Sequence, residues 1–380
     1  MRMHTITPPS SKAPSRIFGV AATVLVAALL VACGTPNTSA DLPSDPSGKG
    51  FHNNYAPAEK SFPDVVRWLY NRTLHGLPPK PQHPTPQLAA DVAFIQSNAL
   101  AGAKMVPAVT WIGHASTLVQ ASGLNVLVDP VFSQRASPFQ WIGPKRVQPP
   151  GLSLEQLPKI DVVLISHNHF DHMDAQSLID LNQQASGPPL YIVPLGLKAW
   201  LEARGVHHVR ELGWWNSTMV AGVELMLTPA QHWSGRGIGD HSETLWGSWA
   251  VLGDDFQWFF SGDSGYSHDF LDIKTRLADR QTPAKGGGFD LALIAIGAYA
   301  PRWFMHPQHI DPAEAVQVHK DVGAKRSIGV HWGTFNLSDE ALDQPPIDLA
   351  IARLAAKMKD DEFSVMAIGE TRRFATRKAQ

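Results

Sequence analysis

Short apolar runs, rich in β-branched and aromatic residues, recur along the chain from residue 106 onward. Runs of this kind, bounded by turn residues, are typical of β-strands. Some are apolar at every position, as at residues 162–165, which favours strands buried on both faces. We expect strands at residues 109–112, 117–121, 126–128, 162–165, 191–193, 223–227, 249–252, 258–260, 291–296 and 328–330.

Helices are expected between and after the later strands, with a further short helix ahead of the first strand. Asp174 and Asp311 suit the N-cap position of two of them, and Pro312 suits a first helical position. The early strands come in hairpins, whereas helices intersperse with the later ones. This order predicts an α/β (α+β) chain in which sheets lie between helical layers. The expected helices are residues 62–74, 175–185, 197–203, 269–277, 312–322 and 347–359.

The N-terminus has a different pattern. Residues 1–16 are polar and carry basic residues, and residues 17–32 are apolar without a charge. The apolar run is shorter than the roughly 20 residues that span a bilayer, so it indicates a signal peptide. Its end, Leu-Val-Ala-Cys-Gly at residues 30–34, resembles the lipobox at which bacterial lipoproteins are cleaved and then lipidated on cysteine. The alternatives are a plain secretory signal and an uncleaved anchor helix.

We therefore expect three parts: a signal peptide at residues 1–32, a flexible tether at residues 33–61 and one folded domain at residues 62–380. The tether is expected because the segment after Cys33 is rich in Pro, Ser, Asn, Asp and Gly. Two or more acyl chains on Cys33 would anchor the domain stably to a membrane. Gly34 resembles the outer-membrane sorting pattern. The expected location is the bacterial cell envelope, on the periplasmic face of the outer membrane.

Composition narrows the chemistry. The chain has 380 residues, 44% of them hydrophobic, and a formal net charge of −2. This is a globular composition, and its near-neutral charge gives no electrostatic basis for binding nucleic acid. The single cysteine excludes an internal disulfide and any multi-thiolate zinc site. A bound metal would therefore need imidazole and carboxylate ligands, so the positions of the 17 histidines matter most.

The central motif is His167-Asn-His169-Phe-Asp171-His172, which directly follows an expected strand. Residues two apart in an extended chain face the same side, so His167 and His169 can point at one metal ion. The turn toward the next helix would bring Asp171 and His172 to a second, adjacent ion. Histidine and aspartate are good ligands for zinc and similar divalent ions. The alternative is that these are solvated surface histidines.

Three later residues, His232, Asp263 and His331, each lie in a turn after an expected strand. Strand ends are where α/β folds collect functional groups, which favours a role in the same site. Each residue also has a plain structural interpretation. His232 lies beside a tryptophan and fits a packed histidine, and Asp263 in Gly-Asp-Ser-Gly fits a turn residue.

Together, His167-x-His169-x-Asp171-His172, His232, Asp263 and His331 resemble the seven ligands of the metallo-β-lactamase superfamily. Further segments resemble, in the same order, those of N-acylphosphatidylethanolamine-hydrolysing phospholipase D within that superfamily. The resemblance covers roughly residues 62–374 and implies a metallo-β-lactamase-like αββα sandwich. The matching segments are residues 111–115, 129–133, 143–146, 231–233, 245–249, 262–266, 301–305, 308–312 and 331–335.

The resemblance implies two Zn²⁺ per chain, the first held by His167, His169 and His232 and the second by Asp171, His172 and His331. Asp263 would bridge the two ions, and a shared hydroxide would attack phosphorus. The implied activity is hydrolysis of an N-acylphosphatidylethanolamine-type phospholipid in the phospholipase D sense, with Asp263 and Asp171 as catalytic residues. No serine or cysteine nucleophile is expected. The same ligands also accept other divalent ions, such as manganese or iron.

Four further residues are candidates for roles around the ions. Asp129 is expected either to orient a ligand histidine or to be a turn residue. His114 is expected to be structural or to support a ligand. Gln308 and His309 match a family segment that lines the site. They would contact substrate, and His309 would also be a candidate for leaving-group protonation; a structural role at a helix entry is the alternative.

Other functions stay open from the residues alone. Superfamily relatives with similar ligands open lactones, so a lactonase or another metal-dependent hydrolase is the first alternative. A non-catalytic, metal-stabilised lipid-binding lipoprotein is the second, although a binding module does not need an open dinuclear centre. The expected partners are a phospholipid or another phosphodiester, the membrane through Cys33, and a second copy of the chain as a candidate.

Overall fold

The computed structural model describes residues 50–58, 60–237 and 239–377. The expected signal peptide, the expected lipidation site Cys33 and most of the expected tether lie outside these residues. Within the described part of the chain, no helix is both long and apolar enough to span a membrane.

Two seven-stranded sheets form the centre of the domain, in the orders β14-β1-β2-β3-β4-β5-β6 and β13-β12-β11-β10-β9-β8-β7. In each sheet, antiparallel pairs occupy one half and parallel pairs the other. The strands of the first sheet are β1 (Ala108–Gly113), β2 (Ser116–Ala121), β3 (Leu124–Val128), β4 (Val162–Leu164), β5 (Leu190–Pro194), β6 (Val209–Leu212) and β14 (Thr371–Arg373). Those of the second are β7 (Ser217–Val220), β8 (Val223–Thr228), β9 (Ser248–Leu252), β10 (Gln257–Phe260), β11 (Leu291–Ala295), β12 (Ser327–Val330) and β13 (Phe363–Val365).

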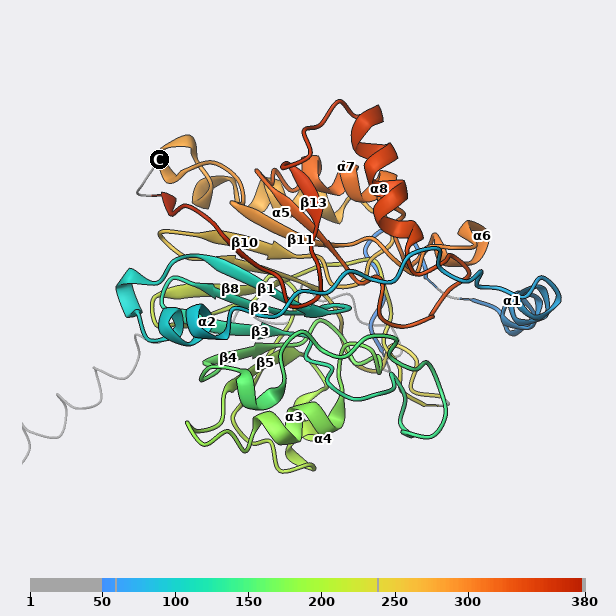
Figure 1. Cartoon of the computed structure of the whole chain (residues 1–380), viewed down its shortest axis with the longest axis horizontal. Coiled ribbons are helices and arrows are strands. Elements are labelled where there is room, and N and C mark those ends of the chain that lie inside the picture. The colour runs from blue at the N-terminus through green and yellow to red at the C-terminus, as the bar shows by residue number, and fades with distance from the viewer. Residues whose placement is uncertain (1–49, 59, 238, 378–380) are drawn as a thin grey trace, which may run out of the picture. The chain divides into compact units, whose positions relative to one another are not determined.

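The alternation of side chains along β4 shows how both faces of a sheet are buried. Val162 and Leu164 lie in the core shared by the two sheets, whereas Val163 and Ile165 belong to a second core with helix side chains. Figure 1 shows α3 (Ala175–Leu181) and α4 (Lys198–Glu202) outside the first sheet. It shows α5 (Asp269–Arg276), α7 (Pro312–Asp321) and α8 (Gln344–Ala355) outside the second. The expected arrangement of sheets between helical layers is therefore confirmed.

All ten expected strands are present within one or two residues of the expected bounds. The pattern missed β6, β7, β13 and β14, because these are short and polar or edge strands; β14, for example, reads Thr-Arg-Arg. It also missed the short helices α2 (Val92–Ala99) and α6 (Arg302–Met305). Helix α8 begins earlier than expected because prolines occupy its first turn, where a missing N–H costs nothing. Asp174 is the N-cap residue of α3 as expected, but its carboxylate accepts from Ser133 N–H and the Ser177 hydroxyl and makes no capping hydrogen bond to a helix N–H.

Helix α1 (Phe62–Leu74) has the expected bounds and projects from the domain (Figure 1). A capping box formed by Ser61 and Asp64 starts it. The ring of Trp68 stacks on that of Phe304 with 4.9 Å between centroids, and its Nε1 donates to Asp339. These contacts fix one side of α1 to α6 and to the loop between β12 and α8.

Asp311 caps α7 as expected, because its Oδ1 accepts hydrogen bonds of 2.9 Å from the N–H groups of both Ala313 and Glu314. Asp311→Ala should therefore lower the free energy of unfolding by about 1 kcal/mol. Asp311→Asn keeps the accepting oxygen and should lower the free energy of unfolding much less. Urea unfolding followed by circular dichroism measures both variants, and equal stability of wild type and Asp311→Ala would contradict the assignment.

Candidate metal centre

The expected ligands lie in four turns that meet at one edge of the sandwich. The His-x-His-x-Asp-His motif occupies the turn between β4 and α3, and His232, Asp263 and His331 follow β8, β10 and β12. Strands β8, β10 and β12 run in the same direction, because β9 is antiparallel to both β8 and β10 and the later pairs are parallel. Their carboxyl ends therefore share an edge, and the turns there converge.

Three histidines form the first cluster. The Nε2 of His167 lies 2.9 Å from the Nδ1 of His169, and the Nε2 of His232 lies 3.2 Å from that same Nδ1. Two Zn–N bonds of about 2.0–2.1 Å at a tetrahedral angle hold their nitrogens roughly 3.3 Å apart. The spacing of the three nitrogens is thus that of ligands around one ion.

The second cluster contains Asp171, His172, His331 and His114. The Nε2 of His331 lies 3.1 Å from the Nε2 of His172 and 3.2 Å from the Oδ2 of Asp171. The Nε2 of His114 lies 2.9 Å from the same carboxylate oxygen. His114 is therefore in contact with an expected ligand, at a position from which it can hold the Asp171 carboxylate.

Asp263 lies between the two clusters. Its Oδ2 is 3.1 Å from the Nε2 of His172 and 3.2 Å from that of His331. The same oxygen is 3.9 Å from the Nε2 of His167 and 4.0 Å from that of His232. One carboxylate oxygen thus faces both clusters, which is the position of a bridging ligand.

Hydrogen bonds behind the rings determine which nitrogen each histidine presents. The Nδ1 of His172 lies 2.7 Å from the Oδ2 of Asp129, which also accepts a 2.6 Å hydrogen bond from the Ser166 hydroxyl. The Ser166 oxygen lies 2.9 Å from the Nδ1 of His167. Both rings consequently turn their Nε2 atoms into the site, as ligand histidines do when a neighbour holds the other nitrogen. Asp129 thus contacts the Nδ1 of His172, and its orienting role stays a prediction.

Three residues at the site have strained backbones. Asp129, His114 and His331 adopt positive φ angles of 41°, 55° and 62°. Non-glycine residues in this region cost about 1–3 kcal/mol each and persist only where their surroundings enforce them. The N–H of His331 donates a 2.9 Å hydrogen bond to the carbonyl of His114, which joins two of the strained turns.

Burial controls the protonation of the first cluster. It lowers the pKa of His169 to about 4 and the pKa values of His167 and His232 well below their usual range. These rings are neutral near pH 7 and offer lone pairs, which is the form that binds metal.

In the second cluster, burial lowers the pKa of His114 to about 3. For Asp171, His172 and His331, and for Asp263 beside them, burial also disfavours the charged forms, but the neighbouring charges outweigh it. The histidines around Asp171 and Asp263 hold the pKa of both carboxyls well below the usual range. Asp263 and Asp171 in turn raise the pKa of His331 to about 9.

The site therefore contains two ionised carboxylates that require positive charge, Asp263, which is buried, and Asp171, which is partly buried. The Oδ1 of Asp263 and the Nε2 of His169 are buried and have no hydrogen-bond partner within the described residues. Converging neutral imidazoles, two carboxylates and unpartnered polar atoms together fit a pair of divalent cations. The buried His/Asp clusters are thus consistent with a dinuclear metal site.

The clusters open into a cavity of about 740 Å³. From the site, His169, Asp171 and Asp263 line it, together with the expected substrate residues Gln308 and His309. Much of the remaining wall is apolar, with Val65, Trp68, Phe304, Met305 and Leu337. The carbonyl oxygen of Gln308 also lies 3.0 Å from the Nδ1 of His232, so this residue supports an expected ligand as well as lining the cavity.

Several residues at the site escaped the sequence analysis, among them Ser166, Lys60 and Asn53. Ser166 carried a weak signal, as a polar residue that ends an apolar strand just before the motif. Lys60 lines the cavity with its Nζ 4.1 Å from the centre of the Phe304 ring. Asn53 bonds the backbone of His232. Both Lys60 and Asn53 lie in the range that was expected to be a tether, where no sequence motif indicated a functional residue.

Comparisons with known proteins agree with this geometry. A family model described as "Beta-lactamase superfamily domain" matches residues 124–332. The "N-acyl-phosphatidylethanolamine-hydrolyzing phospholipase D 1" of Caenorhabditis elegans is 40% identical over 275 residues, which cover 69% of this chain and 74% of that protein. The mitochondrial N-acyl-phosphatidylethanolamine-hydrolyzing phospholipase D of Saccharomyces cerevisiae is 38% identical over 243 residues, 62% of this chain and 49% of that protein.

A solved structure supports the fold. Igni18, a metallo hydrolase from the archaeon Ignicoccus hospitalis, superposes with a TM-score of 0.52 at 19% identity. The superposition covers 71% of this chain and 98% of that one. At this identity the similarity concerns the fold alone.

Removing divalent ions with a chelator should lower the melting temperature of the protein. Ions at about 1,000 times their Kd contribute roughly 4 kcal/mol per site. For a domain of roughly 300 residues each kcal/mol shifts the melting temperature by about 1.5 °C, so emptying two sites should lower it by about 10 °C. Refilling with Zn²⁺ should restore the wild type, whereas His169→Ala should respond less. A melting temperature that the chelator leaves unchanged would contradict a metal centre.

Proposed function

The chain belongs to the metallo-β-lactamase superfamily, and we propose that it is a dinuclear zinc-dependent phosphodiesterase that cleaves an N-acylphosphatidylethanolamine-type phospholipid. Cleavage in the phospholipase D sense would release phosphatidic acid and the head-group alcohol. The observation that carries the proposal is the pair of His/Asp clusters around Asp263, open to a mostly apolar cavity. The names of the worm and yeast relatives support the choice of substrate class.

We assign the ligands as the family resemblance implies: His167, His169 and His232 to one ion, Asp171, His172 and His331 to the other, and Asp263 to both. Bound divalent ions would supply Lewis-acid stabilisation of phosphate charge and a water of lowered pKa. Zinc is the proposed metal because imidazole and carboxylate ligands at these spacings suit it.

The chain's own groups would hold substrate and move protons. Asp171 and Asp263 are ionised carboxylates in the cavity wall, so either can accept a proton from an attacking water. The Nδ1 of His309 lies 3.9 Å from the Oδ2 of Asp263, and its ring lines the cavity beside them. This position supports the proposal that His309 hydrogen-bonds the leaving group.

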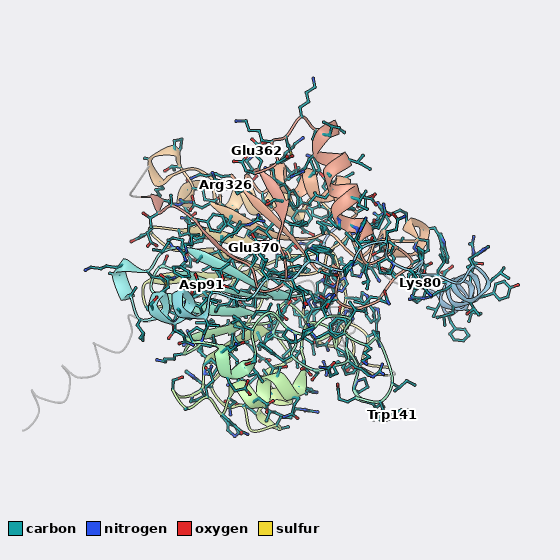
Figure 2. The ribbon with its side chains drawn as sticks, in the orientation of Figure 1. Lys80, Asp91, Trp141, Arg326, Glu362 and Glu370 are labelled. Carbon is teal, nitrogen blue, oxygen red and sulfur yellow. The ribbon has the colours of Figure 1, made fainter. Side chains whose placement is uncertain are left out.

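Apolar surface around the cavity supports a lipid substrate. Helix α1 contributes Val65 and Trp68 to the cavity wall and exposes the large apolar side chains of Phe62, Val66, Leu69, Tyr70 and Leu74. On the loop between β3 and β4, Ala136 lines the cavity and Trp141 is 74% exposed at the periphery of the domain (Figure 2). Aromatic and aliphatic side chains of this kind suit a membrane interface. A lipid anchor on Cys33 would keep the domain at the membrane of the cell envelope.

Asp263→Asn tests the centre and the reaction together. Mutation of a group that hydrogen-bonds a metal ligand typically lowers metal affinity or activity by about 10–100-fold. Loss of a bridging carboxylate should therefore lower metal affinity and activity by more than about 100-fold. We expect wild type to bind two metal ions per chain and to release phosphatidic acid from vesicles containing N-acylphosphatidylethanolamine. Elemental analysis and mass spectrometry of the lipids measure the two quantities.

The exposed Asp279→Asn serves as the matched control and should behave as wild type. If wild type binds two ions but leaves the phospholipid intact, the proposed metal centre stands and the proposed substrate is rejected. Turnover of lactones in the same preparation would then favour the lactonase alternative.

Lys60 should bind the anionic phosphate, because the structure places this cationic side chain in the cavity wall. A hydrogen bond to a charged group is worth about 1.5–3 kcal/mol, so Lys60→Met should raise KM by about tenfold or more and change kcat little. Burial lowers the pKa of Lys60 to about 7, so its charge is present below this pH and lost above it. The wild-type KM should therefore rise as the pH increases through about 7. The KM of Lys60→Met should not show this rise.

Steady-state kinetics on both sides of this pH measures the effect. Lys145→Met, which removes an exposed lysine outside the cavity lining, is the control. Equal KM values for wild type and Lys60→Met would rule out a phosphate contact.

A further inference from the structure

The segment at residues 50–58, here called the strap, lies against the loop that carries His232. The N–H of Phe51 donates a 2.8 Å hydrogen bond to the carbonyl of Ser242. Further along, the side chain of Asn54 donates a 2.7 Å hydrogen bond to Asp269, and the Tyr55 hydroxyl donates to a carboxylate of α5. The strap is therefore fixed on both sides of Asn53.

Asn53 pairs with the backbone of His232 as a neighbouring strand would. The N–H of His232 donates a 2.9 Å hydrogen bond to the Oδ1 of Asn53. The Nδ2 of Asn53 donates a 2.9 Å hydrogen bond to the carbonyl of His232. A side-chain amide offers a donor and an acceptor side by side, so it matches both groups at once. In the part of the chain that the structure describes, no other hydrogen bond reaches the N–H or the carbonyl of His232.

The loop has other attachments on both sides of His232. The carbonyl of Gln231 accepts a 2.8 Å hydrogen bond from Gly265, and the hydroxyl of Ser234 donates a 2.6 Å one to Thr244. His232 itself is only 1% exposed, so its peptide groups would be left buried and unpaired without Asn53. Losing Asn53 should thus shift His232 while the loop stays folded.

We propose that Asn53 is a positioning residue for the metal ion assigned to His167, His169 and His232. The inference rests on the proposed metal centre and adds a residue to it from outside the family-matched region. It also moves the start of the functional domain from residue 62 back to the strap. The strap, which follows the expected tether, would then directly contact the metal ligand His232.

The test compares full-length Asn53→Ala, Asn53→Asp and the neighbouring Asn54→Ala. Asn54 lies in the same strap but bonds Asp269 rather than the His232 loop, so its loss should leave metal binding unchanged. Zinc retained against a competing chelator is measured by elemental analysis. Asn53→Ala should lower the affinity for one of the two ions by about 10–100-fold and leave the affinity for the other unchanged. Asn53→Asp keeps the acceptor but not the donor and should give an intermediate loss.

Two outcomes would overturn the positioning role: Asn53→Ala retaining both ions as wild type does, or Asn54→Ala losing as much zinc. Circular dichroism verifies folding, and Asn53→Asp decides the question if the alanine variant does not fold. A wild type that binds no zinc would reject the metal centre and this inference with it. If the variants behave as expected but phospholipid stays intact, the inference stands and only the proposed substrate fails.

Discussion

The charge on one buried carboxylate constrains the whole site. The Oδ2 of Asp263 lies 3.1 to 4.0 Å from the Nε2 atoms of four histidines, and its burial is nearly complete. A carboxylate in such a place costs several kcal/mol unless cations compensate it. Neutral imidazoles cannot do so, and those of the first cluster are kept neutral by burial. Compensation must therefore come from protons on His172 and His331 or from metal ions, and a pair of divalent ions satisfies both clusters together.

Such an arrangement holds only if the ligands cannot relax away from one another. The supporting hydrogen bonds join His172 to Asp129, His232 to Asn53 and His232 to Gln308, which are 43, 179 and 76 positions apart. Each bond links separate parts of the fold, and the ligands His172 and His232 lie in turns that follow strands packed in the two cores. Ligand geometry is thus a property of the whole sandwich. The positive φ angles at Asp129 and His331 fit this view, because only a rigid surrounding keeps such strained turns in place.

The parts of the fold that sequence patterns predicted are those where burial is nearly complete. Strands such as β4 and β11 are apolar at every position and could be located closely, whereas β6 and β14 are short edge strands that carry charged side chains. The histidine motif was visible because its ligands are adjacent in the chain. Asn53 could not be predicted in the same way, since its function depends on a contact with a residue far along the sequence. Lys60 likewise could not be predicted, because its place in the cavity wall depends on its contact with Phe304 in the folded chain.

Metal chemistry and substrate choice depend on different parts of the molecule. Two ions stabilise developing negative charge in a lactone or a phosphodiester alike, so the ligands alone do not select between them. Selection must come from the cavity, where Lys60 supplies a positive charge and Trp68, Phe304 and Leu337 supply apolar surface. A substrate that uses both needs an anionic group beside the metal ions and a long apolar part beyond it. A phospholipid has this combination, whereas a small soluble diester would leave the apolar wall in contact with water.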